Sequence, residues 1–75
     1  RIHIKPGGQL SAQPHLEGSE EYITVFAGQL RITVDGQDYE LSMGDSIRFH
    51  ADVAHAYYNP GTEDTELSML IYYRR

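Results

Sequence analysis

Apolar and polar residues alternate along most of the chain. The clearest run is 30–34, where Leu30, Ile32 and Val34 alternate with polar residues. A period of two places these three side chains on one face of a β-strand. Residues 22–26 are rich in β-branched and aromatic side chains and predict a second strand, which stops at Gly28. No window of a dozen residues shows the 3.6-residue period of a helix. The pattern therefore predicts an all-β chain.

Turn signals separate the predicted strands. Asp35 and Gly36 suit a type I′ hairpin, because both central positions of that turn need a positive φ. Gly44 and the Asn-Pro-Gly sequence at 59–61 mark further turns. Turns spaced every eight to twelve residues favour an antiparallel sandwich or barrel over a parallel sheet. Beyond the two strands above, strands are expected at 2–4, 39–41, 47–49, 67–73 and from His55 onward.

The length of the chain limits how it can be stabilised. Seventy-five residues permit one domain, 1–75. The chain has no cysteine, so disulfides and thiolate zinc sites are excluded. A bound metal, oligomerisation or contacts with another part of the polypeptide remain as further sources of stability. Because Arg1 already precedes a predicted strand, we expect a domain taken from a longer protein.

The charge and hydropathy of the chain limit the classes of partner that it can bind. A net charge of −5, with six dispersed basic residues, argues against direct nucleic-acid binding, which needs a basic surface. No apolar run approaches the roughly 18 residues of a membrane span. No signal peptide is visible. We therefore expect no membrane partner and a cytoplasmic location.

Four side chains form a candidate metal site. His15, Glu17 and Glu21 lie close together in the sequence, and His55 lies well downstream. Side chains two apart on an extended segment point to the same side, so the first three can share a face. Glu21 also has the parity of Ile23, and a carboxylate on a core-facing register is costly unless it is paired or bound to metal. Facing strands would bring His55 to this set, whose mixed nitrogen and oxygen donors suit a divalent transition metal.

Two further residues are candidates for contacting a small molecule. Tyr57 shares the strand face of His55 and could line a pocket. Arg48 alternates with core positions, so it faces outward or into a cavity, where it could grip a carboxylate with two hydrogen bonds. Simpler interpretations stay open: the histidines could be hydrogen-bonded residues of a barrel mouth, and the tyrosines could fill the core.

The residues of the candidate site resemble the two motifs of the cupin family. The stretch from His15 to Gly28 is similar to the first motif, H-x-H-x(3,4)-E-x6-G, with Glu17 in place of the second histidine. The stretch from Gly44 to Asn59 is similar to the second, G-x5-P-x-G-x2-H-x3-N. The resemblance implies a small double-stranded β-helix, or jelly-roll barrel. It also implies that Zn, Fe, Mn or Ni is held by the corresponding residues, His15, Glu17, Glu21 and His55.

A finer resemblance covers the segments 15–22, 34–37, 44–49 and 55–60. The sequences of these segments are similar to the C-terminal cupin of bacterial regulators that carry an N-terminal helix-turn-helix of the XRE type. This resemblance implies a domain that senses a small effector, by analogy an amino acid or other small carboxylate. It also implies a homodimer, formed through a sheet face or an exchanged edge strand, that contacts DNA only through a missing N-terminal domain.

Two other functions remain open at this point. One is a small metal-dependent cupin enzyme, such as a dioxygenase, isomerase or decarboxylase. The other is a metal-free dimerisation module. Beyond the presumed ligands the sequence offers no convincing acid/base pair, so no catalytic residue is assigned and sensing is preferred over catalysis.

Overall fold

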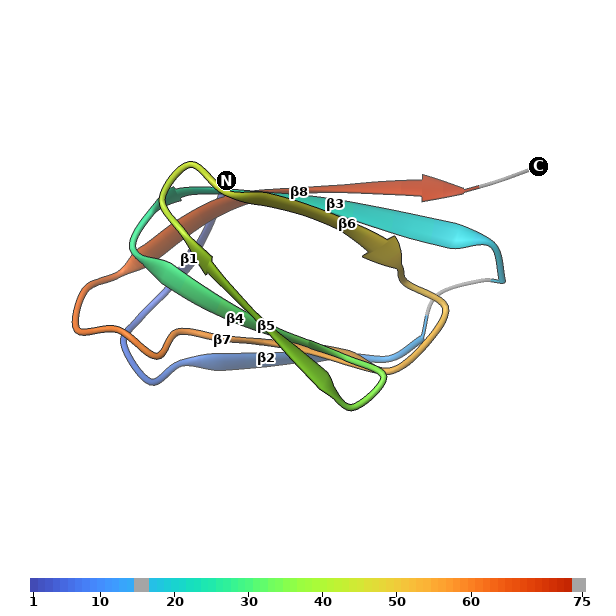
Figure 1. Cartoon of the computed structure of the whole chain (residues 1–75), viewed down its shortest axis with the longest axis horizontal. Helices are drawn as coiled ribbons and strands as arrows, with labels where there is room; N and C mark the ends of the chain where they lie inside the picture. The colour runs from blue at the N-terminus through green and yellow to red at the C-terminus, as the bar shows by residue number, and fades with distance from the viewer. Residues whose placement is uncertain (15–16, 74–75) are drawn as a thin grey trace.

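The computed structural model of the chain describes residues 1–14 and 17–73. Within these residues every regular element is a strand, and the strands form two four-stranded antiparallel sheets that face each other as two layers (Figure 1). The first sheet has the order β1-β8-β3-β6 and the second β2-β7-β4-β5. The all-β prediction is confirmed. The strands are β1 (Ile2–Ile4), β2 (Gln9–Ala12), β3 (Ser19–Ala27), β4 (Gln29–Val34), β5 (Gln37–Ser42), β6 (Ser46–His50), β7 (His55–Tyr58) and β8 (Thr65–Tyr73).

The hairpin between β4 and β5 forms where the sequence predicts it. Asp35 has a φ of 50° and Gly36 a φ of 81°, so both central residues are left-handed as the type I′ turn requires. The hairpin sets Val34 opposite Gln37 and Leu30 opposite Leu41. This register turns the alternating apolar residues of β4 toward the interior.

The core lies between the sheets and takes residues from both. β3 alternates clearly: Glu21, Ile23 and Val25 are buried, while Tyr22 and Phe26 on its other face are exposed. The fully or nearly fully buried apolar cluster comprises Ile4, Ile23, Val25, Leu30, Ile32, Leu41, Tyr57 and Leu67. Among the described residues, no helix has the length and apolarity to cross a membrane.

The interior is apolar at one end and ionisable at the other. Toward the β3–β4 turn the core contains Val25 opposite Leu67. Toward the β4–β5 hairpin the buried side chains become polar, with Glu21 on β3 and His55 on β7. His55 pairs with Val34, the last residue of β4, which fixes its position beside the hairpin. We call this region the polar end of the barrel.

Asn59 closes the opposite end by hydrogen bonding. Its side chain is fully buried, and its amide nitrogen donates to the carbonyls of Ile4 at 2.8 Å and Glu63 at 2.7 Å. Its amide oxygen accepts from the backbone N–H of Gly61 at 2.9 Å. One side chain therefore connects β1 to the loop between β7 and β8.

Gly28 is required by both conformation and space. Its φ is 79°, and a Cβ placed on it would lie 2.6 Å from the carbonyl oxygen of Asp64 and 2.9 Å from Cα of Thr65. These neighbours are backbone atoms, so they cannot move aside as a flexible side chain can. The turn between β3 and β4 therefore packs directly against the start of β8.

Gly28→Ala should destabilise the fold more than Gly36→Ala. Both glycines have a φ near 80°, so each alanine costs about 1 kcal/mol of unfolding free energy for the left-handed backbone. Only Gly28 also meets backbone atoms, while the space around Gly36 is open. We expect about 2 kcal/mol of additional loss for Gly28→Ala, measured by urea denaturation. Equal losses in the two variants would contradict this packing.

Candidate functional site

The central feature of the polar end is a buried carboxylate–imidazole pair. Glu21 comes from β3 of the first sheet and His55 from β7 of the second, so the pair spans the space between the layers. Nε2 of His55 lies 3.5 Å from Oε2 of Glu21, and both side chains are completely buried. Two of the four predicted ligands are thus brought together by strands that are far apart in sequence.

Hydrogen bonds orient both members of the pair. The Tyr57 hydroxyl, on the same face of β7 as His55, donates to Oε1 of Glu21. Nδ1 of His55 lies 2.8 Å from the carbonyl oxygen of Val53. Because a carbonyl oxygen only accepts, Nδ1 carries the proton and Nε2 faces Glu21. Each side chain therefore directs one particular atom into the space between them.

Tyr57 stays a neutral donor. Burial raises the pKa of its hydroxyl above the usual 10, and the hydrogen bond and negative charge of Glu21 raise the pKa further. A protonated tyrosine holds one carboxylate oxygen of Glu21 and leaves the other turned toward His55. The predicted pocket residue thus acts on Glu21 directly.

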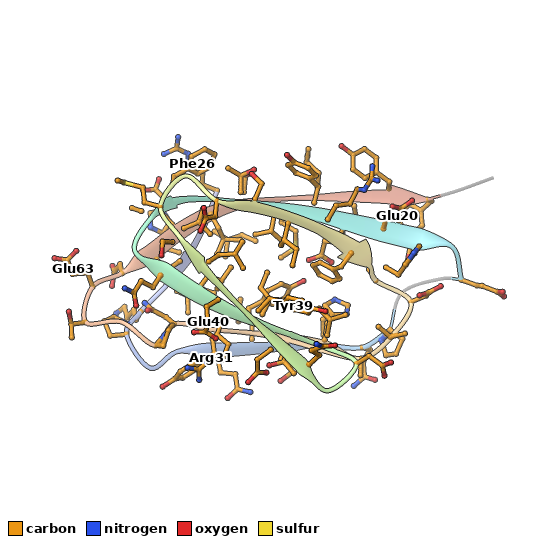
Figure 2. The ribbon with its side chains drawn as sticks, in the orientation of Figure 1. Glu20, Phe26, Arg31, Tyr39, Glu40 and Glu63 are labelled. Carbon is orange, nitrogen blue, oxygen red and sulfur yellow. The ribbon has the colours of Figure 1, made fainter. Side chains whose placement is uncertain are left out.

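Aromatic rings and a groove border the pair. The rings of Phe49 and Tyr57 both contact the imidazole of His55 edge-on. The distance between ring centroids is 5.4 Å for Phe49 and 5.7 Å for Tyr57. A hollow of about 370 Å³ opens between the edge strands β5 and β6, and Phe49 is part of its wall. Phe49 thus both lines this groove and contacts the ring of His55. We call it the mouth groove; its lining includes Val34, Asp35, Gln37, Tyr39 (labelled in Figure 2), Phe49 and Val53.

A larger hollow lies at the other end of the barrel. It measures about 510 Å³ and is lined by Gly28, Gln29, Met43 and Gly61, among others. Its ionisable wall residue, Glu63, is exposed to solvent. Because perturbed or buried titratable groups mark functional sites better than size does, the candidate site is the polar end.

The other predicted site residues are placed differently. Glu17 is exposed in the turn 17–18, where Gly18 has a φ of 82° and donates its N–H to Oδ2 of Asp52 at 3.0 Å. This turn interrupts the extended segment on which the shared face of Glu17 and Glu21 was predicted. His15 lies outside the described residues. Asp52, which occupies a glycine position of the second motif, thus anchors the turn that precedes β3.

Arg48 is also separated from the pair. It lies on the outer face of β6 with its side chain 68% exposed, and its Nε is 3.5 Å from Oε1 of Glu20. Phe49, the next residue, faces the interior instead. Arg48 therefore has no contact with the polar end, and the two sides of β6 belong to different surfaces.

The pair suits two positions on one metal ion. Two ligands bound to a tetrahedral ion with bonds of about 2.1 Å lie about 3.4 Å apart, close to the 3.5 Å between Glu21 Oε2 and His55 Nε2. One oxygen and one imidazole nitrogen form a donor set that Zn, Fe, Mn and Ni accept. Within 1–14 and 17–73, no three His, Asp or Glu side chains gather as a metal-holding group.

Sequence reasoning missed two contributors to the site. Phe49 was expected only on the core-facing side of a strand, and its alternation along β6 does not reveal that it lines a groove and contacts His55. The backbone carbonyl of Val53, which orients His55, carries no sequence signal at all. The roles of Phe49 and of the Val53 carbonyl can be recognised only once the 51–54 loop is placed beside the β4–β5 hairpin.

The comparisons with known proteins agree with this arrangement. Residues 1–72 match the cupin domain family Cupin_2. The chain is 38% identical over 74 residues to the HTH-type transcriptional regulator SutR of Escherichia coli (strain K12), covering 99% of this chain and 42% of the regulator. It is 37% identical over 67 residues to a mannose-1-phosphate guanylyltransferase of Salmonella montevideo, covering 89% of this chain but 14% of the enzyme. The chain thus spans less than half of each of these curated relatives.

A solved structure gives the same assignment. The Cupin_2 domain of an XRE family transcriptional regulator from Enterobacter cloacae superposes with a TM-score of 0.93 and 32% identity, covering 97% of this chain and 77% of that one. The predicted jelly-roll fold and the resemblance to regulator cupins are confirmed. With residues 1–72 matched and two regulators among its relatives, the chain belongs to the cupin domain family.

Proposed function

We propose that the chain is the effector-sensing and dimerisation domain of a bacterial transcription regulator of the XRE type. A small molecule binds at the polar end of the barrel, and DNA is contacted by a helix-turn-helix segment ahead of Arg1. In this proposal the domain binds its ligand without transforming it and works in the cytoplasm. The observation that carries the proposal is the fully buried Glu21–His55 pair beside the mouth groove.

The cost of burying the pair supports a functional role. Removing a carboxylate from water costs several kcal/mol, and apolar replacements of buried ion pairs are often neutral or stabilising. A 75-residue chain has a small core in which to absorb that cost. Glu21 and His55 nevertheless occupy interior positions. Comparable interior positions in the same two sheets are filled by apolar residues such as Val25 and Ile32. Ligand binding gives these residues a reason to be polar.

The pair also supports a resident divalent transition metal, Zn, Fe, Mn or Ni. Glu21 and His55 would hold it, with His15 and Glu17 as the further ligands that the cupin motif supplies. When bound, the ion provides positive charge for an oxygen atom of the ligand. An amino acid or other small carboxylate needs such a charge, because Asp35 lines the groove and the Glu21 carboxylate lies 3.5 Å from Nε2 of His55.

The position of the pair suggests how binding is transmitted. Glu21 belongs to one sheet and His55 to the other, so a ligand held between them links the two layers. Such a ligand shifts the domain between two states only in proportion to its difference in affinity for them. The Tyr57 hydroxyl donates to Oε1 of Glu21 and so fixes the orientation of that carboxylate in this structure. A change in layer spacing would then reach any surface formed by the outer face of either sheet.

Effector binding should depend on Glu21. We expect at least one amino acid or small carboxylate in a broad panel to raise the melting temperature by roughly 5–10 °C at about tenfold excess over its Kd. Glu21→Gln should abolish the rise, because it removes a carboxylate that would hold the positive ion to which the effector binds. Glu40→Gln, on the exposed outer face of β5, is the matched control and should keep it. A rise of equal size in Glu21→Gln would contradict binding at the polar end.

Metal content should follow the proposed ligands. We expect about one transition-metal ion per chain by elemental analysis, and its loss in both His15→Ala and His55→Ala. His3→Ala, a surface histidine on β1, should retain the ion. The readout is the metal itself, so it does not depend on knowing the effector. Equal metal content in the wild type and both ligand variants would rule out the ligand assignment.

The regulator proposal makes a prediction about the gene. We expect the full-length reading frame to encode a helix-turn-helix segment ahead of Arg1, and the full-length protein to bind DNA in an electrophoretic mobility assay. The 75 residues alone, with their net charge of −5, should not bind the same DNA. A full-length protein consisting of a cupin alone would contradict the regulator role.

A further inference from the structure

Ser19 carries a buried hydroxyl at the beginning of β3. It lies two residues before Glu21 on the same face of the strand, and the whole residue is buried. Glu20, between them, is on the other face, where its carboxylate lies 3.5 Å from Nε of Arg48. Two residues along a strand span about 6.6 Å, so one small head group can reach both Ser19 and Glu21. Ser19 therefore belongs to the polar end of the barrel.

The hydroxyl of Ser19 has no hydrogen-bond partner within residues 1–14 and 17–73. In the same part of the chain, the other buried side chains that can donate a hydrogen bond all have an acceptor; they are His55, Tyr57, Asn59 and Thr65. Burying a hydroxyl without a partner is unfavourable, because its hydrogen bonds to water are lost and not replaced. A ligand that accepts a hydrogen bond from Ser19 would remove this cost.

Backbone hydrogen bonds fix the position of Ser19. Its carbonyl oxygen accepts from the N–H of Ala51 at 3.0 Å. The residue before it, Gly18, donates its N–H to Oδ2 of Asp52 at 3.0 Å. Both partners belong to the loop that leads into β7, so Ser19 is held in place relative to His55 as well as to its own strand. A group that is already ordered loses little freedom when it binds a ligand.

The chemistry of Ser19 complements that of the buried pair. Nδ1 of His55 carries the proton, so its Nε2 is an acceptor, and Oε2 of Glu21 is an acceptor too. These two atoms suit a cation, whereas an oxygen atom of a ligand needs a donor such as the Ser19 hydroxyl. Hydrogen bonds to an ionised acceptor are roughly twice as strong as those between neutral groups. A carboxylate oxygen is therefore the ligand atom that gains most from Ser19.

We propose that the Ser19 hydroxyl donates a hydrogen bond to a carboxylate oxygen of the bound effector and so helps to determine which small molecules the domain binds. The inference rests on the ligand site proposed above, and it adds the chemical group of the effector that this site selects. It also predicts opposite effects of removing the hydroxyl: weaker binding of a carboxylate, but no loss of stability in the protein without effector. A serine with a purely structural role would not separate these two effects.

The test compares Ser19→Ala with Thr65→Val, a matched control that removes a buried hydroxyl at the apolar end of the barrel, where it donates to the carbonyl of Gln29. The probe is acetate, a minimal carboxylate, titrated at constant ionic strength into isotope-labelled protein and followed by NMR chemical shifts. We expect Ser19→Ala to raise the Kd for acetate about tenfold or more, because a hydrogen bond to a charged group is lost. Thr65→Val should leave this Kd unchanged.

Melting temperatures without acetate give a second measurement on the same variants. Ser19→Ala should melt at the wild-type temperature or up to about 8 °C higher, because no unpaired hydroxyl has to be desolvated on folding. Thr65→Val should melt about 4 °C lower or more, because the carbonyl of Gln29 loses its donor. The two variants thus differ in the sign of the melting shift as well as in acetate binding.

Other results overturn the inference. These are a wild-type protein that does not bind acetate, a Kd that Ser19→Ala changes by less than about twofold, an equal loss of binding in both variants, or a clear drop in melting temperature for Ser19→Ala. The regulator role fails separately. Effectors that bind through Glu21 but not through Ser19 would overturn the Ser19 contact alone. A Ser19-dependent acetate site in a full-length protein without a helix-turn-helix would overturn the regulator role alone.

Discussion

The structure depends on one constraint: two antiparallel sheets pack face to face so that alternate residues of β3 and β7 meet in a shared interior. Once the layers are stacked, strand parity decides which side chains become buried. It places Ile23 and Val25 in the apolar core and carries Glu21, on the same face, into the interior as well. From the opposite layer it brings His55 to within 3.5 Å of that carboxylate.

The two ends of the interior have different roles: the apolar end stabilises the fold, and the polar end contains the candidate site. The apolar end supplies most of the burial that stabilises a small chain, and Asn59 and Gly28 close it with a buried amide and a close backbone contact. The polar end contributes less to stability, since its carboxylate and imidazole must be desolvated. Tyr57 belongs to both regions, because its ring packs in the core while its hydroxyl binds Glu21.

Local signals were sufficient where neighbouring residues set the structure. The Asp35–Gly36 hairpin follows from backbone conformation alone, and the burial of Glu21 follows from its parity with Ile23. Strand β2 was not foreseen, because Leu10 is its one large apolar residue and the strand lies at a sheet edge with most of its residues exposed. Glu17 was expected to share a face with Glu21, but the turn at 17–18 breaks the extended geometry on which that expectation rested.

The sequence by itself determined the strands other than β2, the cupin motifs and the interior register of Glu21, because these depend on a period of two and on turn residues that act locally. Only the tertiary structure decided that Tyr57 binds Glu21, that Phe49 both lines a groove and contacts His55, and that Arg48 faces outward beside Glu20. These features arise from strands distant in sequence, whose spacing is set by how the sheets pair and stack.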